Sequence, residues 1–252
     1  MNPFSLENET ALITGGGTGI GLGIARCMIA AGARVVLVGR RESELSKACA
    51  ELGPNASYAA QDITSFEDMP TLVRRAEESS GTPVSILVNN AGIHVKKPAV
   101  ETTTEDFQSV LNTHLLAAHA LTRAVVPGMI SRGRGSILFT SSMAAYMGVP
   151  QVIAYSAAKS AFFGMVSTLS AELASQGIRV NAIAPGWIFS EMSAKALDSD
   201  PARKSKVMAR IQMGRMGQPE DIGNTAVFLS SPAAAYITGV TLPVDGGATV
   251  SF

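Results

Sequence analysis

The chain has 252 residues, of which 46% are hydrophobic and 16% charged, so it can bury a large core. Twenty Lys and Arg balance twenty Asp and Glu, which excludes a strong overall attraction to nucleic acid or to an anionic membrane. The two cysteines, Cys27 and Cys49, form no Cys-x-x-Cys pair, no leader-like segment opens the chain, and no apolar run reaches the length of a membrane span. We therefore expect a cytoplasmic protein with reduced core thiols and no contact with a membrane or nucleic acid.

Short aliphatic runs alternate along the chain with longer segments of helical spacing, the pattern of βα units on a parallel sheet. Strands are predicted at residues 10–14, 34–38, 57–60, 84–89, 135–141, 179–184 and 240–244. Helices are predicted near residues 19–31, 42–52, 66–79, 104–132, 154–175 and 219–230. Because the strands are apolar on both faces, helices should cover both sides of the sheet. The expected fold is a single doubly wound α/β domain spanning residues 1–252.

One segment breaks this rhythm. Residues 190–214 are polar and rich in Met, Lys and Arg, and they lie between the sixth and seventh predicted strands. Such an insertion beside the ends of the strands suits a lid over a substrate pocket. An excess of basic residues here could steer an anionic substrate, although a solvated helix face explains it equally simply.

A cluster of glycines follows the first predicted strand and opens directly into a helix, in the sequence Thr14-Gly-Gly-Gly-Thr-Gly-Ile-Gly21. Glycines let a backbone turn sharply and approach a diphosphate, which the free N–H groups of the helix N-terminus then bind. The strict G-x-G-x-x-G spacing is absent, and so is the Lys-Ser/Thr pair of a P-loop. An ordinary tight turn is the alternative. The candidate cofactor-binding residues here are Gly15, Gly17, Thr18, Gly19, Ile20 and Gly21.

Four segments occur in the order and spacing of one known family: the glycine turn, Asn89-Asn-Ala-Gly92, Tyr155-Ser-Ala-Ala-Lys159 and Pro185-Gly186. On them the chain resembles the short-chain dehydrogenase/reductase superfamily, from about residue 6 to Gly247. The resemblance implies a Rossmann-type domain with a seven-stranded parallel sheet, a nicotinamide cofactor, no metal in catalysis and, often, a homotetramer. A metal site is not expected from the histidines either, because His114 and His119 stand five apart with no completing carboxylate.

The end of the second predicted strand bears on which nicotinamide cofactor binds. Dinucleotide folds that bind NAD place an acid about 20 residues beyond the glycine turn, where it holds the ribose hydroxyls and repels a 2′-phosphate. Here that position is Gly39, followed by Arg40 and Arg41, whose guanidinium groups suit phosphate. Alternatively, both arginines are solvated residues that begin a helix and pair with Glu44. We predict NADP(H) rather than NAD(H).

The resemblance implies further cofactor contacts. Asp62 matches the residue that contacts the adenine amino group, although it could instead cap a helix starting near Ser65. Ser190 stands where the family expects a threonine that binds the carboxamide, and it keeps the hydroxyl. The full set of these further candidates is Asp62, Ile63, Asn89, Ala91, Gly92, Tyr155, Lys159, Pro185, Gly186, Ile188 and Ser190.

Tyr155 and Lys159 stand four residues apart at the start of a predicted helix and so share one face. Reduction of a ketone by hydride builds negative charge on oxygen, and a neutral acid must deliver a proton to it. A phenol performs this near neutral pH only if a neighbouring ammonium stabilises its phenolate. By resemblance, Ser142 polarises the carbonyl, Lys159 holds the nicotinamide ribose, and Asn112 helps to organise a proton-relay water. Asn112 could equally be an ordinary helix-surface amide.

Substrate identity is not encoded in these motifs. Residues beyond the strand ends that could line a pocket are His94, Met143, Val149, Trp187 and Met192. His94 could act as a second acid, although a lone loop histidine is more often a surface residue.

The leading hypothesis is an NADP(H)-dependent enzyme that interconverts a ketone and a secondary alcohol, with Tyr155 as general acid and base. One alternative assigns 3-oxoacyl thioesters on acyl carrier protein as its substrates. A non-catalytic dinucleotide-binding regulator is another, but it would have no need of a phenol beside an ammonium. A homotetramer is expected by resemblance.

Overall fold

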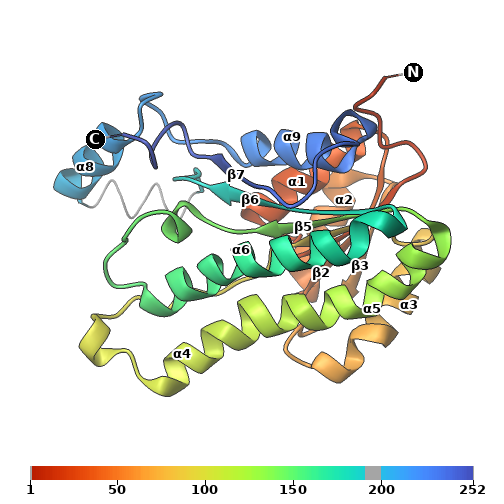
Figure 1. Ribbon diagram of the computed structural model, residues 1–252, viewed down its shortest axis with the longest axis horizontal. Coiled ribbons are helices and arrows are strands. Elements are labelled where there is room, and N and C mark those ends of the chain that lie inside the picture. Colours follow the sequence, from red (N-terminus) through yellow and green to blue (C-terminus); the bar gives the residue numbers. More distant parts are fainter. Residues whose placement is uncertain (1, 191–199, 252) are drawn as a thin grey trace.

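The strands form one parallel sheet in the computed structural model, which describes residues 2–190 and 200–251 (Figure 1). The strand order is β3-β2-β1-β4-β5-β6-β7, with every neighbouring pair parallel. The strands are β1 (Thr10–Thr14), β2 (Arg34–Gly39), β3 (Ala56–Ala60), β4 (Ile86–Asn89), β5 (Gly135–Thr140), β6 (Ile178–Pro185) and β7 (Thr241–Val244). All seven predicted strands are therefore confirmed, with only small shifts at their ends.

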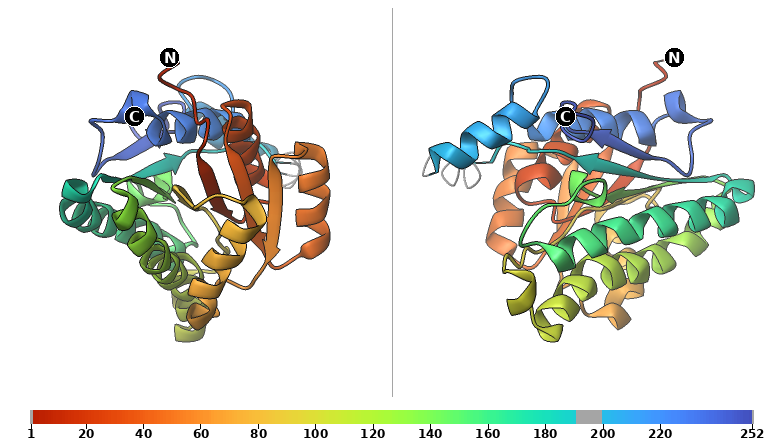
Figure 2. Two further views of the ribbon diagram at one scale, coloured as in Figure 1. Left: turned by 90° about the vertical axis from the view of Figure 1, so that its right-hand side faces the viewer. Right: turned by 60° about the vertical axis from the view of Figure 1, so that its left-hand side comes forward.

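Helices cover both faces of the sheet, as Figure 2 shows edge-on. One face carries α1 (Gly19–Ala30), α2 (Glu42–Leu52) and α9 (Pro219–Ser230), and the other carries α3 (Met69–Ser80), α5 (Ala117–Arg132) and α6 (Ile153–Leu173). Successive strand residues alternate between the two cores: Leu12 and Val36 face the α3 side, whereas Ile13 and Leu37 face the α1 side. This double burial is why the strands are apolar throughout, and it confirms the doubly wound fold.

The structure corrects the expectation of a single regular helix at residues 104–132. It contains α4 (Thr104–Leu111), a π-helical turn at Asn112–Leu116 and then α5. In the π turn the Ala117 N–H donates to the Asn112 carbonyl, five residues back, instead of four. Asn112 is therefore not inside a regular helix but at a break in the hydrogen-bond ladder, a feature often found at functional sites.

Residues 190–214 form no continuous element in the described part of the chain. Residues 191–199, including the pocket candidate Met192, lie outside the described residues. The remainder contains α8 (Pro201–Arg210), whose last residue is tied to the C-terminal turn. Arg210 Nε donates to the Ala248 carbonyl at 3.0 Å, and Ser251 Oγ donates to the Arg210 carbonyl at 2.8 Å.

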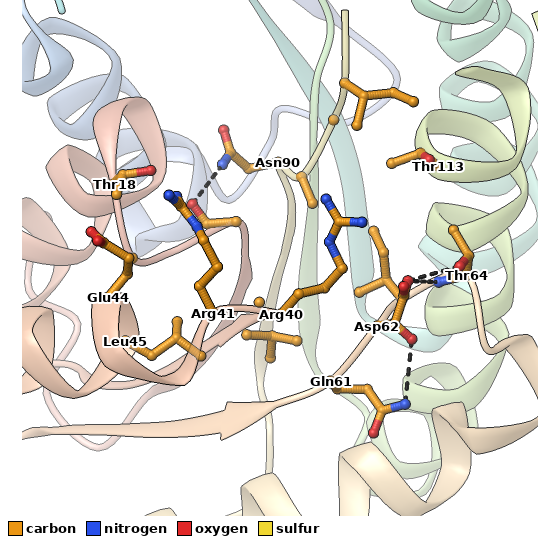
Figure 3. A pocket seen from close by; sticks show the side chains of 18 of the residues that line it. Thr18, Arg40, Arg41, Glu44, Leu45, Gln61, Asp62, Thr64, Asn90 and Thr113 are labelled. Atoms are coloured by element: carbon orange, nitrogen blue, oxygen red, sulfur yellow. Dashed lines mark hydrogen bonds between the residues drawn. The ribbon is translucent and has the colours of Figure 1, made fainter. Parts of the chain in front are cut away.

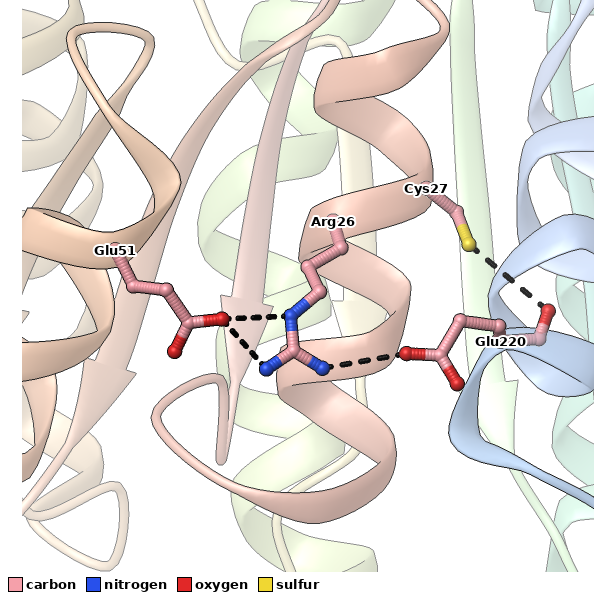
Figure 4. A network of polar contacts seen from close by, with 4 residues as sticks. All are labelled: Arg26, Cys27, Glu51 and Glu220. Carbon is pink, nitrogen blue, oxygen red and sulfur yellow. Dashed lines mark hydrogen bonds and ion pairs between the residues drawn. The ribbon is translucent and has the colours of Figure 1, made fainter.

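A surface ion-pair network joins three elements on the α1 face (Figure 4). Arg26 on α1 contacts Glu51 on α2 at 2.6 Å and Glu220 on α9 at 3.2 Å. All three side chains are more than two-fifths exposed, so the network stabilises the fold by no more than about 1 kcal/mol.

The two cysteines are less buried than the sequence predicts. Cys27 is half-buried between α1 and α9, and Cys49 is also half-buried, which corrects the expectation of core thiols. Among the described helices, none has the length and hydropathy needed to cross a bilayer.

Candidate active site

The candidate site lies at the point in the sheet where the order in which the chain adds strands reverses direction. From β1 the chain builds outward through β2 to β3, and then crosses back to β4 on the opposite side of β1. The connections after β1 and β4 therefore diverge at their carboxyl ends and leave a crevice, the usual ligand site of a doubly wound sheet.

The glycine turn after β1 is closely packed on one side and open on the other. A Cβ at Gly21 would lie 2.2 Å from the Gly15 carbonyl oxygen, so only glycine allows the helix to begin this close to the strand. At Gly19, which has a φ of +54°, a Cβ would meet nothing within 4 Å. The open space is thus at the N-terminus of α1, where free N–H groups point outward. This cradle fits a diphosphate, as the sequence predicts.

The loop after β4 is tied to the glycine turn by Asn90 and Thr14. The Thr14 hydroxyl oxygen accepts from the backbone N–H groups of Asn90 and Ala91, both at 3.0 Å, and Asn90 Nδ2 donates to the Thr14 carbonyl at 3.0 Å. The predicted candidate Asn89 instead turns its side chain into the core, where Nδ2 donates to Thr122 Oγ1 on α5 at 3.2 Å. Asn90, which the sequence reasoning missed, therefore connects the two loops.

A cavity of about 630 Å³ opens beside these loops (Figure 3). It has room for the adenosine half of a dinucleotide. The predicted site residues that line it are Gly15, Gly17, Thr18, Arg40, Arg41, Asp62, Ile63, Ala91, Gly92 and Asn112. The structure thus brings together residues from the glycine turn, the end of β2, the loop after β3 and the π turn.

Arg40 and Arg41 border this cavity from the end of β2, and Figure 3 shows both side chains beside it. Among the described residues, neither guanidinium group makes a hydrogen bond or an ion pair, so the alternative pairing with Glu44 is absent although Glu44 also lines the cavity. Two unpaired guanidinium groups fit a phosphate group.

Asp62 caps no helix, contrary to the alternative offered by the sequence. One of its carboxylate oxygens accepts from the Thr64 N–H at 2.9 Å and from the Thr64 hydroxyl at 2.7 Å. These hydrogen bonds, with the nearby Arg40 charge, hold the pKa of Asp62 below its usual value. The carboxylate is therefore fixed in its ionised form at the cavity edge.

Ser142, Tyr155 and Lys159 meet beyond the end of β5. Ser142 directly follows the strand's last residues, and its hydroxyl oxygen accepts from the Ala144 N–H at 3.1 Å. Tyr155 is in the first turn of α6, and Lys159 Nζ lies 5.5 Å from the centre of its ring. Burial raises the pKa of Tyr155, and a hydrogen bond with Ser142 opposes that rise. The phenol is therefore protonated and beside a hydroxyl group.

Lys159 is buried, and no carboxylate of the described residues pairs with it. Its Nζ donates to the Thr140 carbonyl, and burial lowers its pKa to about 7. The unfolded chain holds this lysine near pKa ~10.4, so between about pH 7 and pH 10 the unfolded state binds more protons than the folded state. Stability should therefore rise with pH across that range.

We expect Lys159→Met to relieve this cost at neutral pH. The stability gain of the variant over the wild type should be about 3 kcal/mol larger at pH 7 than at pH 10, because across that range the unfolded lysine stays mostly protonated while the folded lysine is mostly neutral, so that the wild type gains stability as the pH rises. Urea unfolding of both proteins at the two pH values measures this difference. A stability difference that does not change with pH would show that the buried lysine is not held near neutrality.

Asn112 stands at the start of the π turn and lines the cavity. Its side-chain oxygen accepts from Gln108 Nε2 at 2.6 Å, one turn earlier on α4. The side chain is thus a hydrogen-bonded amide that lines the cavity at a break in the helix.

The segment after β6 is held against the loop before α9. Gly186 packs on Asp245, where a Cβ would lie 2.6 Å from the Asp245 Cα. The Phe189 N–H then donates to the Gly217 carbonyl at 2.7 Å, and the Gly217 N–H to the Trp187 carbonyl at 2.9 Å. This pairing fixes the backbone from Pro185 to Ser190, which is the segment expected to bind the carboxamide of the nicotinamide.

Comparison with known proteins agrees with this geometry. The family model described as enoyl-(acyl carrier protein) reductase matches residues 15–249. The galactitol 2-dehydrogenase (L-tagatose-forming) of Cereibacter sphaeroides is 39% identical over 98% of this chain and 97% of its own length. The 3-oxoacyl-acyl-carrier-protein reductase FabG of Vibrio harveyi is 34% identical over 97% of this chain and 98% of its own.

A solved structure extends the likeness to three dimensions. A gluconate 5-dehydrogenase from Burkholderia cenocepacia J2315, in complex with NADP and tartrate, superposes with a TM-score of 0.92 at 32% identity, covering 100% of this chain and 99% of that one. The resemblance drawn from the four sequence motifs is thus confirmed over nearly the whole chain. The protein belongs to the short-chain dehydrogenase/reductase superfamily and is an oxidoreductase of that superfamily.

Proposed function

We propose that the protein interconverts a secondary alcohol and a ketone with NADP(H), using Tyr155 as the general acid and base. The observation that carries this proposal is the meeting of Tyr155, Ser142 and Lys159 beyond β5, with unpaired Arg40 and Arg41 at the end of β2. When bound, the cofactor supplies or accepts the hydride.

The residues of the chain then manage the oxygen and its proton. Tyr155 donates its phenolic proton to the carbonyl oxygen as negative charge develops there, and the Ser142 hydroxyl donates a hydrogen bond to the same oxygen. Lys159, whose pKa is about 7, stabilises the phenolate that remains when its own amine is protonated, and it holds the ribose hydroxyls. Asn112 orders the water through which the proton is replaced.

Other residues hold the cofactor. The glycine turn and the N-terminus of α1 bind the diphosphate, Arg40 and Arg41 bind the 2′-phosphate, and Asp62 contacts the adenine. Ala91, Gly92 and the segment from Pro185 to Ser190 border the nicotinamide half. Residues 200–214, the described part of the candidate lid, cover the bound substrate in this proposal.

Two substrate classes follow from the relatives, and one assay separates them. The galactitol and gluconate enzymes are named for free polyols or aldonates, whereas the FabG relative is named for carrier-bound thioesters. Loss of NADPH absorbance is measured with cyclohexanone, with the keto sugar fructose and with an acetoacetyl thioester of acyl carrier protein. Reduction of a free ketone supports the first class. Exclusive reduction of the thioester supports the second, and reduction of none contradicts the proposed function.

We also propose a cytoplasmic homotetramer. The outer edge of β7 is unpaired among the described strands, and Leu242 and Val240 are exposed along it. Leu116 on the π turn and Ile130 on α5 are exposed as well, and a monomer would leave these apolar side chains in water. Sedimentation at micromolar concentration should give a mass of about four times the 26.2 kDa chain. A monomer would contradict this assembly.

A further inference from the structure

The loop after β4 places a histidine directly over the proposed proton donor. The imidazole ring of His94 packs on the phenol ring of Tyr155, with ring centres 4.3 Å apart and planes tilted by 31°. More than a third of the His94 surface nevertheless remains exposed. His94 therefore packs against the side chain of Tyr155 while part of its own surface stays exposed. The sequence offered His94 as a pocket residue or a second acid, with an ordinary surface histidine as the alternative.

The loop that carries His94 is fixed on both sides. The neighbouring Ile93 carbonyl lies 2.8 Å, and its N–H 2.9 Å, from Nε2 of the buried His114. Gly92 permits this packing, because a Cβ there would lie 2.1 Å from His114 Cε1. Three residues beyond His94, the Lys97 N–H donates to the Gln151 carbonyl at 3.0 Å, and Lys97 Nζ pairs with an acid on α4. The imidazole is thus held in place before any substrate arrives.

The chemistry of the imidazole suits a hydroxyl group. Partial burial and the nearby Lys159 charge lower the pKa of His94, so the ring is neutral at neutral pH. A neutral imidazole carries one hydrogen-bond donor and one acceptor, the same pair of functions that an alcohol offers. No described residue forms a hydrogen bond with either ring nitrogen of His94, so both are available to a ligand.

We propose that His94 binds the hydroxyl group on the carbon next to the reacting carbon, and so makes the enzyme selective for vicinal diols and α-hydroxyketones. This inference rests on the proposed function, because it takes the oxygen bound by Tyr155 and Ser142 as the reacting oxygen. When Tyr155 and Ser142 bind the reacting oxygen, the carbon next to the reacting carbon lies beside the imidazole ring of His94, because that ring packs on the phenol of Tyr155. A polyhydroxylated substrate places a hydroxyl there, whereas a 3-oxoacyl chain places none on the neighbouring carbon.

Two variants separate hydrogen bonding from ring packing. His94→Phe keeps an aromatic ring on Tyr155 but cannot hydrogen-bond, whereas His94→Gln keeps a donor and an acceptor but no ring. The probes are hydroxyacetone and acetone, which differ only by the hydroxyl next to the carbonyl carbon. Values of kcat/KM with NADPH are measured for both ketones and all three proteins, and the affinity for NADPH is measured by fluorescence titration.

We expect the wild type to prefer hydroxyacetone by about tenfold or more, as a site built to hydrogen-bond a hydroxyl rejects the analogue that lacks it. His94→Phe should abolish this preference, His94→Gln should keep most of it, and NADPH affinity should be the same in all three. No preference in the wild type, no activity on hydroxyacetone, or a preference that survives in His94→Phe overturns the inference. Failure to reduce any ketone, cyclohexanone and the acetoacetyl thioester included, contradicts the proposed function instead.

Discussion

Tyr155→Phe should lower kcat for ketone reduction by about a thousandfold, the range expected when a positioned general acid is lost. The phenol of Tyr155 is protonated, hydrogen-bonded to Ser142 and within one helical turn of Lys159. Phenylalanine keeps the ring that packs on His94 but removes the phenolic proton that Tyr155 would donate to the carbonyl oxygen. Steady-state kinetics with NADPH and a reducible ketone measures the loss.

Tyr58→Phe is the matched control for this variant. Its hydroxyl is on β3 and donates to Glu42 at 3.2 Å, on the surface. Its removal should leave kcat unchanged. The affinity of Tyr155→Phe for NADPH should stay within about threefold of the wild type, because the glycine turn and the arginines are untouched. Reduction by Tyr155→Phe near the wild-type rate would show that another group supplies the proton.

The second large effect is expected for Gly21→Ala. The new methyl group would lie 2.2 Å from the Gly15 carbonyl oxygen and 2.7 Å from Asn90 Nδ2, so either α1 or the loop after β4 must move. Overpacking of this kind costs about 1–3 kcal/mol of unfolding free energy. The same movement displaces the N–H groups that would bind the diphosphate, so NADPH affinity should fall by at least about tenfold.

Gly164→Ala on α6 is the control, because a Cβ there would meet nothing within 4 Å. Alanine is a better helix former than glycine by about 1 kcal/mol, so this variant should be as stable as the wild type or more so. Urea unfolding and fluorescence titration measure both variants. A Gly21→Ala protein with wild-type stability and NADPH affinity would contradict the tight approach of α1 to β1.

The strands, the helices and the parallel sheet could be predicted because a strand that is buried on both faces appears in the sequence as a run of apolar residues. The central strands are mainly aliphatic and buried on both faces, and the chain of alternating strands and helices admits few arrangements other than a doubly wound sheet. The glycine turn, Tyr155 and Lys159 could be put forward as site residues because four motifs occur in the order and spacing of one family, whereas the spacing of Tyr155 and Lys159 alone is a weak signal.

Features set by contacts between distant loops could not be predicted. The π turn at Asn112 is a change of hydrogen-bond partner, which residue types do not record. Whether Asn89 or Asn90 faces the site depends on where β4 ends, and a shift of one residue reverses the direction of a strand side chain. The stacking of His94 on Tyr155 follows from the path of a loop fixed by His114, twenty residues further along.

The proposed function depends most on which cofactor binds, and one titration tests the choice of cofactor directly. Trp187 is the single tryptophan of the chain and follows Gly186 in the candidate carboxamide segment, so its fluorescence should report binding. Titration with NADPH and with NADH should show at least a tenfold preference for NADPH, about 1.4 kcal/mol. The double variant Arg40→Ala/Arg41→Ala should lose that preference and keep NADH binding. Preference for NADH in the wild type would contradict the role of the two arginines, and binding of neither would contradict the dinucleotide site itself.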